Sequence, residues 1–300
     1  MQSTSFFEFI KNITLTTFQF AYNVRVGVKG RKDILNQIDS IPGWFSIQDQ
    51  LIFQLLLQVQ QKNNLSGNLL EIGVYLGKSA VLLGANRGYN DEFIACDLFS
   101  GESSSINNNE NLLAYSGLTR KRFEENYQEV IGELPRILNC SSLKLWKELP
   151  TEKFRFIHID GSHLYNFVKS DLLFATNALV AKGGLIVLDD FRAQHTLGVS
   201  KALWEEIFEG RLQPLIFSAA KVYLVLPEDR IYCLEQIREL LKEVSLDSEF
   251  LDLFPSKSIR VKGLSDADLY NRNSKLTWWV PPIFLPKVRR FLSLLQMHLF

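Results

Sequence analysis

Two short stretches decide how this chain folds: FIHIDGSHLY at residues 156–165 and GLIVLDDF at residues 184–191. Each is an apolar run that stops on carboxylates. Asp160 ends the first run, with His163 three residues further on, and two adjacent aspartates end the second. Continuous apolar runs of this kind are typical of parallel strands that are buried on both faces. Ligands bind at the carboxyl ends of such strands, so we expect these acidic residues to converge on one crevice.

The alternation of strand-like runs and helical spacing extends over residues 44–226. We expect strands at 68–73, 93–96, 136–140, 154–159, 184–188, 214–218 and 221–226. Helical patterns separate the first five of these strands, which predicts parallel connections. The last two have almost nothing between them, too little for a parallel crossover. The sequence therefore predicts an α/β fold, a Rossmann-like doubly wound seven-stranded sheet whose last two strands form an antiparallel hairpin.

The chain divides into three zones. Residues 1–43 read as a helical N-terminal extension, residues 44–226 as the sheet domain, and residues 227–300 as a C-terminal extension that we also expect to be helical. From Pro286 onward, basic and apolar residues alternate at helical spacing. This segment fits either a helix that binds a membrane surface or a partner, or a helix packed on the sheet or a dimer interface, and we favour the second. We expect a homo-oligomer.

The composition is that of an ordinary globular protein, with 46% hydrophobic and 22% charged residues and a formal net charge of zero. Proteins that bind nucleic acid usually carry a basic excess, so we expect no nucleic-acid partner. The three cysteines lie far apart, which argues against a disulfide framework or a structural zinc site. We expect no transmembrane segment and no secretory signal, hence a cytoplasmic protein.

A glycine-containing loop follows the first expected strand, in LEIGVYLGKSA at residues 70–80. Gly73 and Gly77 flank the turn, and Lys78 and Ser79 open a helix. Glycine permits a tight turn and the close approach of a ligand, and a helix N-terminus favours an anionic group. The pattern is neither G-x-G-x-x-G nor a P-loop, and a plain strand-to-helix turn remains open. Glu71 stands inside the apolar strand, where an acid needs a partner.

Asp97 ends the second expected strand, 24 residues after Gly73. An acid at this place binds ribose hydroxyls in nucleotide-binding sheets. Since the chain has no phosphate-binding loop, these residues indicate an adenosine ligand without a pyrophosphate.

Four motifs in this order resemble those of class I methyltransferases that use S-adenosylmethionine (SAM): LEIGVYLGKSA, ACDLFSG, FIHIDGSHLYNFVKSDL and AKGGLIVLDDF. The resemblance is to the group that includes macrocin-type sugar O-methyltransferases and cephamycin-pathway methyltransferase-like proteins, and it covers roughly residues 44–226. It implies transfer of a methyl group to a hydroxyl of a small molecule, such as a sugar in natural product biosynthesis.

The resemblance also implies which residues contact the cofactor. Ser141 stands where the family often has a Gly-Asp-Ser-like turn that touches adenine, although the acid of that turn is missing here. Asp97 would hold the ribose hydroxyls, and Leu98 or Phe99 would face the adenine. The methionine side would be lined by Glu71, Gly73 and Gly77. The full set of implied cofactor residues is Glu71, Gly73, Gly77, Ser79, Asp97, Leu98, Phe99, Ser141 and Asp160.

Three carboxylates at neighbouring strand ends repel one another unless a cation intervenes, and oxygen ligands suit Mg²⁺. We expect Mg²⁺ at Asp160, Asp189 and Asp190, provided that the chain turns at the adjacent pair; otherwise one of the pair is structural. In the family, a base at the position of His163 takes the proton from the acceptor hydroxyl, as a neutral imidazole can near pH 7. The alternative is a structural role, in which His163 caps the following helix or forms a hydrogen bond with an acidic side chain. We expect His195 either to pack within its loop or to act as a second base.

Two other functions stay open. One is a methyltransferase fold that uses its cofactor as an electrostatic aid for a rearrangement or cyclisation. The other is a cofactor-binding partner subunit without transfer of its own. The intact acidic residues and His163 count against both, and the acceptor itself cannot be named, because acceptor pockets are built from loops.

Overall fold

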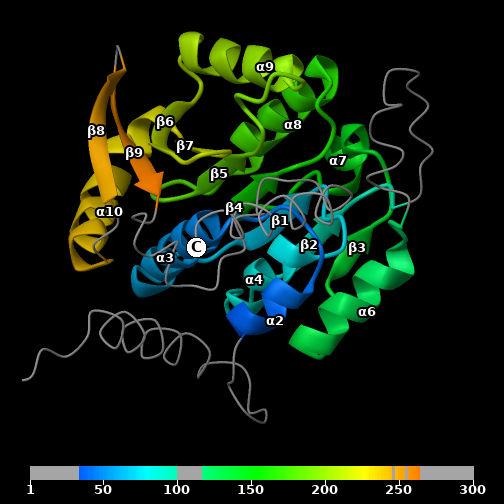
Figure 1. Cartoon of the computed structure of the whole chain (residues 1–300). Coiled ribbons are helices and arrows are strands. Elements are labelled where there is room, and N and C mark those ends of the chain that lie inside the picture. Colours follow the sequence, from blue (N-terminus) through cyan, green and yellow to red (C-terminus); the bar gives the residue numbers. More distant parts are fainter. Residues whose placement is uncertain (1–33, 100–116, 245–246, 254–255, 264–300) are drawn as a thin grey trace, which may run out of the picture.

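The computed structural model describes residues 34–99, 117–244, 247–253 and 256–263. Its centre is a nine-stranded sheet built from β1 (Asn68–Ile72), β2 (Phe93–Cys96), β3 (Arg136–Leu138), β4 (Phe154–Ile159), β5 (Leu185–Leu188), β6 (Gln213–Phe217), β7 (Val222–Val225), β8 (Asp247–Leu253) and β9 (Ser256–Gly263). The strand order is β3-β2-β1-β4-β5-β7-β6-β9-β8 (Figure 1). Strands β1 to β5 pair in parallel, and β7 is antiparallel to both β5 and β6. The predicted α/β fold with a closing antiparallel hairpin is confirmed.

Helices cover both faces of this sheet. They are α2 (Ile34–Ser40), α3 (Ile47–Lys62), α4 (Lys78–Ala85), α6 (Arg120–Ile131), α7 (Leu145–Glu148), α8 (Tyr165–Ala178), α9 (Leu197–Phe208) and α10 (Arg230–Val244), with two 3₁₀ turns, η1 (Ser142–Lys144) and η2 (Pro227–Asp229). In Figure 1, α2, α3 and α4 lie on one side of the sheet and α8 and α9 on the other. Two separate hydrophobic clusters fill the two interfaces. This is the doubly wound arrangement that the strand pattern predicts.

Helix α3 begins at a side-chain cap. The Ser46 hydroxyl accepts a hydrogen bond from the backbone N–H of Asp49 at 3.0 Å, which satisfies one of the free donors of the first turn of α3. One stripe of α3 is buried, and the ring of Phe53 meets that of Phe156 on β4 at 5.0 Å. Capping and the apolar stripe together place α3 across the sheet.

The strand count and the C-terminal extension differ from the prediction. Strands β8 and β9 form an antiparallel hairpin, and β9 pairs in parallel with β6, so the sheet has nine strands instead of seven. Ile259 and Val261 of β9 are buried while Arg260 and Lys262 are exposed, an alternation that makes a strand with one buried face despite the high charge. Within the described residues, the C-terminal extension is therefore helical only in η2 and α10. The helix expected from Pro286 lies outside the described residues.

The N-terminal extension is helical in α2, while residues 1–33 lie outside the described part of the chain. The domain boundaries at 43/44 and 226/227 stay predictions. Among the described helices, none has the length and apolarity required to cross a bilayer.

Candidate active site

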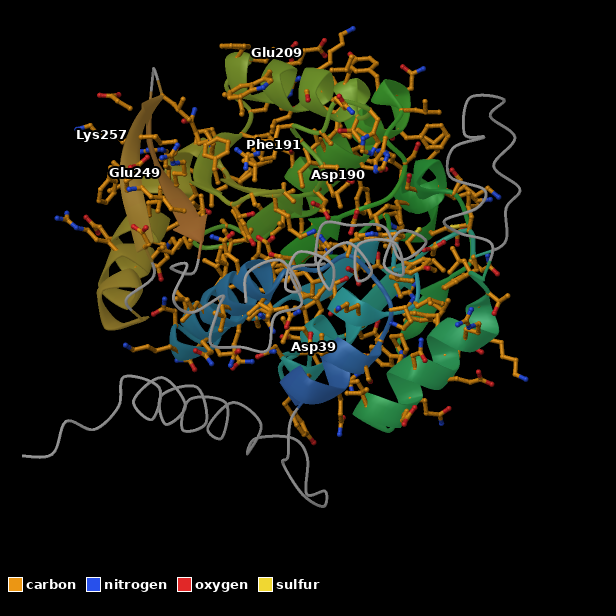
Figure 2. The ribbon with its side chains drawn as sticks, viewed as in Figure 1. Asp39, Asp190, Phe191, Glu209, Glu249 and Lys257 are labelled. Carbon is orange, nitrogen blue, oxygen red and sulfur yellow. The ribbon has the colours of Figure 1, made fainter. Side chains whose placement is uncertain are left out.

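The carboxyl ends of β1, β4 and β5 are joined by backbone hydrogen bonds that continue past the strands. The Asp160 N–H donates to the Ile72 carbonyl at 2.8 Å, and the Asp189 N–H donates to the Ile159 carbonyl at 3.0 Å. Figure 2 labels Asp190, the next residue, near the centre of the view, and its side chain is partly buried. The structure thus brings the ends of the two opening stretches to one edge of the sheet, as their shared position at parallel strand ends predicts.

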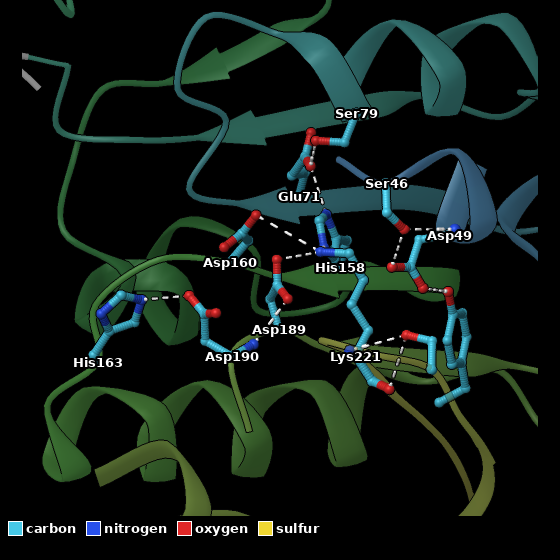
Figure 3. Close-up of polar contacts among 12 residues, drawn as sticks. Ser46, Asp49, Glu71, Ser79, His158, Asp160, His163, Asp189, Asp190 and Lys221 are labelled. Atoms are coloured by element: carbon cyan, nitrogen blue, oxygen red, sulfur yellow. Dashed lines mark hydrogen bonds and ion pairs between the residues drawn. The ribbon is translucent and has the colours of Figure 1, made fainter. Parts of the chain in front are cut away.

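Asp189 and Asp190 are neighbours in sequence, but their side chains contact different groups. The chain turns at Asp190, whose φ is +55° and whose N–H donates to Asp189 Oδ1 at 2.8 Å. Asp190 Oδ2 lies 3.2 Å from His163 Nε2, whereas the Asp189 carboxylate bonds to Lys221 (Figure 3). Burial acts to raise the pKa of Asp190, but the bond and charge of His163 outweigh it and lower the pKa. The pair therefore divides between a histidine and a lysine.

Lys221 is a site residue that sequence reasoning missed. Its ammonium forms an ion pair with Asp189, lies 3.0 Å from His158 Nε2 and 3.9 Å from Asp160 Oδ2, and is 1% exposed (Figure 3). Burial acts to lower the pKa of Lys221, but the carboxylates of Asp189 and Asp160 outweigh it and raise the pKa, so the ammonium stays charged. The signal was available, since an antiparallel last strand begins at the edge where the parallel strands end.

His158 links this lysine to Glu71. Burial and the charge of Lys221 hold the pKa of His158 well below its usual value, so the ring is neutral. Its Nε2 accepts from the ammonium, which leaves Nδ1 to donate to Glu71 Oε1 at 2.6 Å. The Ser79 hydroxyl donates to the same oxygen at 2.5 Å, and burial raises the pKa of Glu71 to about 8. Here is the partner that an acid inside an apolar strand requires.

Asp97 ties the loop after β1 to the turn after β2. Its Oδ2 accepts from the N–H groups of Val74 and Tyr75, at 2.8 and 3.1 Å, and its Oδ1 accepts from the Phe99 N–H at 2.8 Å. Burial raises the pKa of Asp97 against the opposing effect of these N–H donors. Gly77, with φ of +97°, caps α4 without a side chain, so this carboxylate and the helix N-terminus face the same loop.

The residues expected around adenine differ in their exposure to solvent. Leu98 is 39% exposed, whereas Phe99 is 2% exposed and packs on the Phe123 ring at 5.4 Å. Ser141 caps η1, where its hydroxyl accepts from the Leu143 N–H at 3.4 Å. The turn at residues 97–98 is also held by a residue that the motifs did not mark: the Asn139 amide donates to the Leu98 carbonyl at 3.1 Å and to the Asp97 carbonyl at 3.3 Å.

The loop that carries His163 is held by the start of α9. A Cβ at Gly198 would lie 2.5 Å from the His163 carbonyl oxygen and 2.6 Å from the Tyr165 nitrogen, so only glycine allows this approach. The exposed ring of His195 lies 6.0 Å from that of His163, centroid to centroid. The imidazole of His163 is therefore fixed on its backbone side and bonded to Asp190 on its Nε2 side.

Comparison with known proteins places this edge in a family. Residues 70–191, which include β1 to β5 and all the acidic strand ends described above, match the family model of a methyltransferase domain. Residues 70–191 form a SAM-dependent methyltransferase domain. No curated protein matches the sequence.

Several solved methyltransferase structures also resemble the chain. The O-methyltransferase NovP is 17% identical with a TM-score of 0.49, over 72% of this chain and 95% of NovP. The O-methyltransferase from Bacillus cereus in complex with SAH is 15% identical with a TM-score of 0.44, over 72% of this chain and 99% of that chain. TomG from Streptomyces achromogenes, in complex with SAM, is 14% identical with a TM-score of 0.43, over 68% and 94%.

One observation shows that the residues of this domain fit the cofactor S-adenosylmethionine. In the part of the chain that the structure describes, Glu71 Oε2 is a buried oxygen without a hydrogen-bond partner. It stands at the end of β1, beside the loop that Asp97 holds. This oxygen suits the ammonium of the amino acid end of S-adenosylmethionine, whose positive charge would favour the ionised form of Glu71.

The acidic residues of the same domain do not fit the divalent ion that the sequence predicts at Asp160, Asp189 and Asp190. His158, Asp160 and Asp189 offer ligand atoms within 4.8 Å of one another, a spacing that a metal ion would need, but Asp190 is not in this set. The Lys221 ammonium reaches all three of these residues. At an effective dielectric constant of about 20, a doubly charged ion roughly 4 Å from the ammonium would be repelled by about 8 kcal/mol. With Lys221 in place, the site holds a cation already.

Proposed function

We propose that this chain transfers a methyl group from SAM to a hydroxyl oxygen of a small molecule. The observation that carries the proposal is the pair of His163 and Asp190, joined at 3.2 Å beside the acidic strand ends. Bound SAM supplies an electrophilic sulfonium methyl. The remaining tasks are alignment, exclusion of water and removal of the hydroxyl proton, and these belong to the protein.

His163 is the general base of this proposal. Asp190 lies at Nε2 and keeps the hydrogen on that nitrogen, so Nδ1 is the atom that accepts the proton of the acceptor hydroxyl. Since the pKa of Asp190 is lowered, its carboxylate is ionised at neutral pH and stabilises the imidazolium that forms. The contact of Gly198 with the His163 backbone supports the orientation of the ring.

The cofactor contacts follow the expected set. Glu71 would receive the amino acid end of SAM, and Asp97 would accept from the ribose hydroxyls with the capacity that its three N–H donors leave. Exposed Leu98 would lie against the adenine, with Phe99 beneath it in the core. Gly73, Gly77, Ser79, Ser141 and Asp160 complete the proposed set.

Three finer expectations come from the sequence and from the resemblance. A sugar hydroxyl in natural product biosynthesis is the proposed acceptor, and a homo-oligomer in the cytoplasm is the proposed state. Mg²⁺ at Asp160, Asp189 and Asp190 is the third, and we assign it no step, because Lys221 already bonds to Asp189.

A transfer assay tests the proposal. The full chain is incubated with SAM that carries a labelled methyl group and with a panel of hydroxylated small molecules. We expect label in at least one acceptor, and His163→Asn to lower the transfer rate by about 10²- to 10⁴-fold without loss of S-adenosylhomocysteine (SAH) binding. The same change at His195 decides whether that ring is a second base. Undiminished transfer by His163→Asn would refute the role of the pair.

A further inference from the structure

A cation that belongs to the chain itself lies among the acidic strand ends. We propose that the ammonium of Lys221 takes the place of a divalent metal ion in this domain, so that methyl transfer needs no added metal. This inference deepens the proposed function and rests on it. Lys221 acts as a positioning residue, since it contacts the acidic strand ends and not the reacting atoms.

The geometry points to substitution because Lys221 reaches the same three residues that could surround a metal ion. Its ammonium forms an ion pair with Asp189, lies 3.0 Å from His158 Nε2 and lies 3.9 Å from Asp160 Oδ2 (Figure 3). Of these three groups, Asp189 and His158 lie within hydrogen-bond distance of the ammonium, and the Asp160 carboxylate lies at ion-pair distance. The positive charge that Asp160 and Asp189 need is thus covalently attached to the chain.

The fold holds Lys221 at this place from its backbone. In the turn before β7, the Ser218 N–H donates to the Lys221 carbonyl at 2.9 Å, and the Lys221 N–H donates to the Ser218 hydroxyl at 3.0 Å. The next residue, Val222, pairs with Leu188 directly before Asp189. The ammonium lies 5.7 Å from the centroid of the Phe45 ring, which covers it from the side of α3. Because the side chain is 1% exposed, a metal ion would have to displace a buried ammonium.

The consequence is a defined arrangement without metal. Lys221 keeps the Asp160 and Asp189 carboxylates side by side at the ends of β4 and β5, next to the loop that follows β1. It also fixes the neutral His158, whose other nitrogen donates to Glu71. A divalent ion would have to hold the two carboxylates together and fix His158 through the same ligand atoms that Lys221 now contacts.

The test compares Mn²⁺ binding, followed by electron paramagnetic resonance, in the full-length wild type and in Lys221→Met. We expect the wild type to bind Mn²⁺ no tighter than millimolar and to keep its SAH affinity and transfer rate in EDTA. Lys221→Met removes the ammonium but keeps an unbranched side chain. It should bind Mn²⁺ at least about tenfold more tightly, because the like charge is gone. Adding Asp160→Asn to Lys221→Met should abolish that gain.

Micromolar Mn²⁺ binding by the wild type that Asp160→Asn removes, or loss of transfer in EDTA, would overturn the inference. If Lys221→Met does not fold, the wild-type titration still decides. The double variant Lys221→Met/Asp189→Asn, which removes both charges of the ion pair, should then fold and bind no Mn²⁺. Absence of SAH binding by the wild type would instead refute the proposed function. The Mn²⁺ titration does not depend on SAH binding, so the two failures can be distinguished.

Discussion

Gly73 stands where the end of β1 touches the end of β4, and we predict that Gly73→Ala separates them. The φ of Gly73 is +83°, and a Cβ there would lie 2.6 Å from the carbonyl carbon of Asp160 and 2.7 Å from the Cα of Gly161. Both are backbone atoms, which cannot turn aside as a flexible side chain would. The Asp160 N–H bond to the Ile72 carbonyl, at 2.8 Å, lies at the same junction and would lengthen.

The expected loss of stability has three parts. The left-handed conformation costs an alanine roughly 1–2 kcal/mol. The overlap with the backbone adds about 1–3 kcal/mol. The weakened hydrogen bond adds about 0.5–1.5 kcal/mol. Together, Gly73→Ala should lower the free energy of unfolding by roughly 2.5–6.5 kcal/mol, which is a large part of the total stability of a domain of this kind.

Gly132→Ala is the matched control. Gly132 follows α6 with φ of +86°, but a Cβ there would meet no described atom within 4 Å. It should lose only the conformational part, about 1–2 kcal/mol. Urea unfolding followed by circular dichroism measures both variants, and SAH affinity should fall only in Gly73→Ala. Equal losses of stability in the two variants would refute the reasoning, since the contact with β4 would then contribute nothing.

Three further predictions concern single carboxylates. Asp97→Asn should weaken SAH binding at least about tenfold and lower stability by about 1.5–3 kcal/mol, because an amide cannot accept from N–H donors on both sides; calorimetry and urea unfolding measure this. Asp190→Asn should lower the transfer rate by roughly 10²-fold or more with unchanged SAH affinity, because the imidazolium of His163 loses its counter-charge. Asp171→Asn should make the protein more stable above neutral pH, because burial raises the pKa of Asp171 from 3.8 to about 7, and urea unfolding across pH follows the change.

The sign of the last prediction follows from proton binding. Between pH 3.8 and about 7, folded Asp171 keeps a proton that the unfolded chain has lost, so the stability of the wild type falls as pH rises through this window. Asp171→Asn lacks this dependence, and its advantage should grow to roughly 4 kcal/mol at most. A pH-independent difference between the two proteins would contradict it. Unchanged SAH affinity in Asp97→Asn, or full activity in Asp190→Asn, would contradict the other two.

The edge of the sheet was predictable because it depends on strand direction alone. Apolar runs that stop at Asp160 and Asp189 identify buried parallel strands, and parallel strands end together. Sequence spacing does not say where a carboxylate turns next. The left-handed φ of Asp190 sends its side chain to His163, and this follows from the packing of α9 on that loop.

Lys221 was overlooked because its importance depends on pairing between distant strands. In KVYLVL it reads as a charge in front of an apolar run. Only the register of β7 on β5, with Val222 opposite Leu188, brings its ammonium to Asp189. The direction of the closing hairpin was predicted, and applying that direction to the first residue of the run would have found it.

The hairpin of β8 and β9 was missed for a different reason. Its strands are not continuously apolar, because they lie at the edge of the sheet, where one face is solvated. Arg260 and Lys262 pair with Glu249 across the hairpin, so the charges of this segment are cross-strand partners.

The measurement that tests the central claim most directly is calorimetric binding of SAH to the full chain, in Mg²⁺ and in EDTA, with Asp97→Ala as the control. A SAM-dependent methyltransferase that carries its own cation should bind SAH in the micromolar range with the same affinity in both buffers, and Asp97→Ala should lose that binding. No binding by the wild type in either buffer would contradict the account.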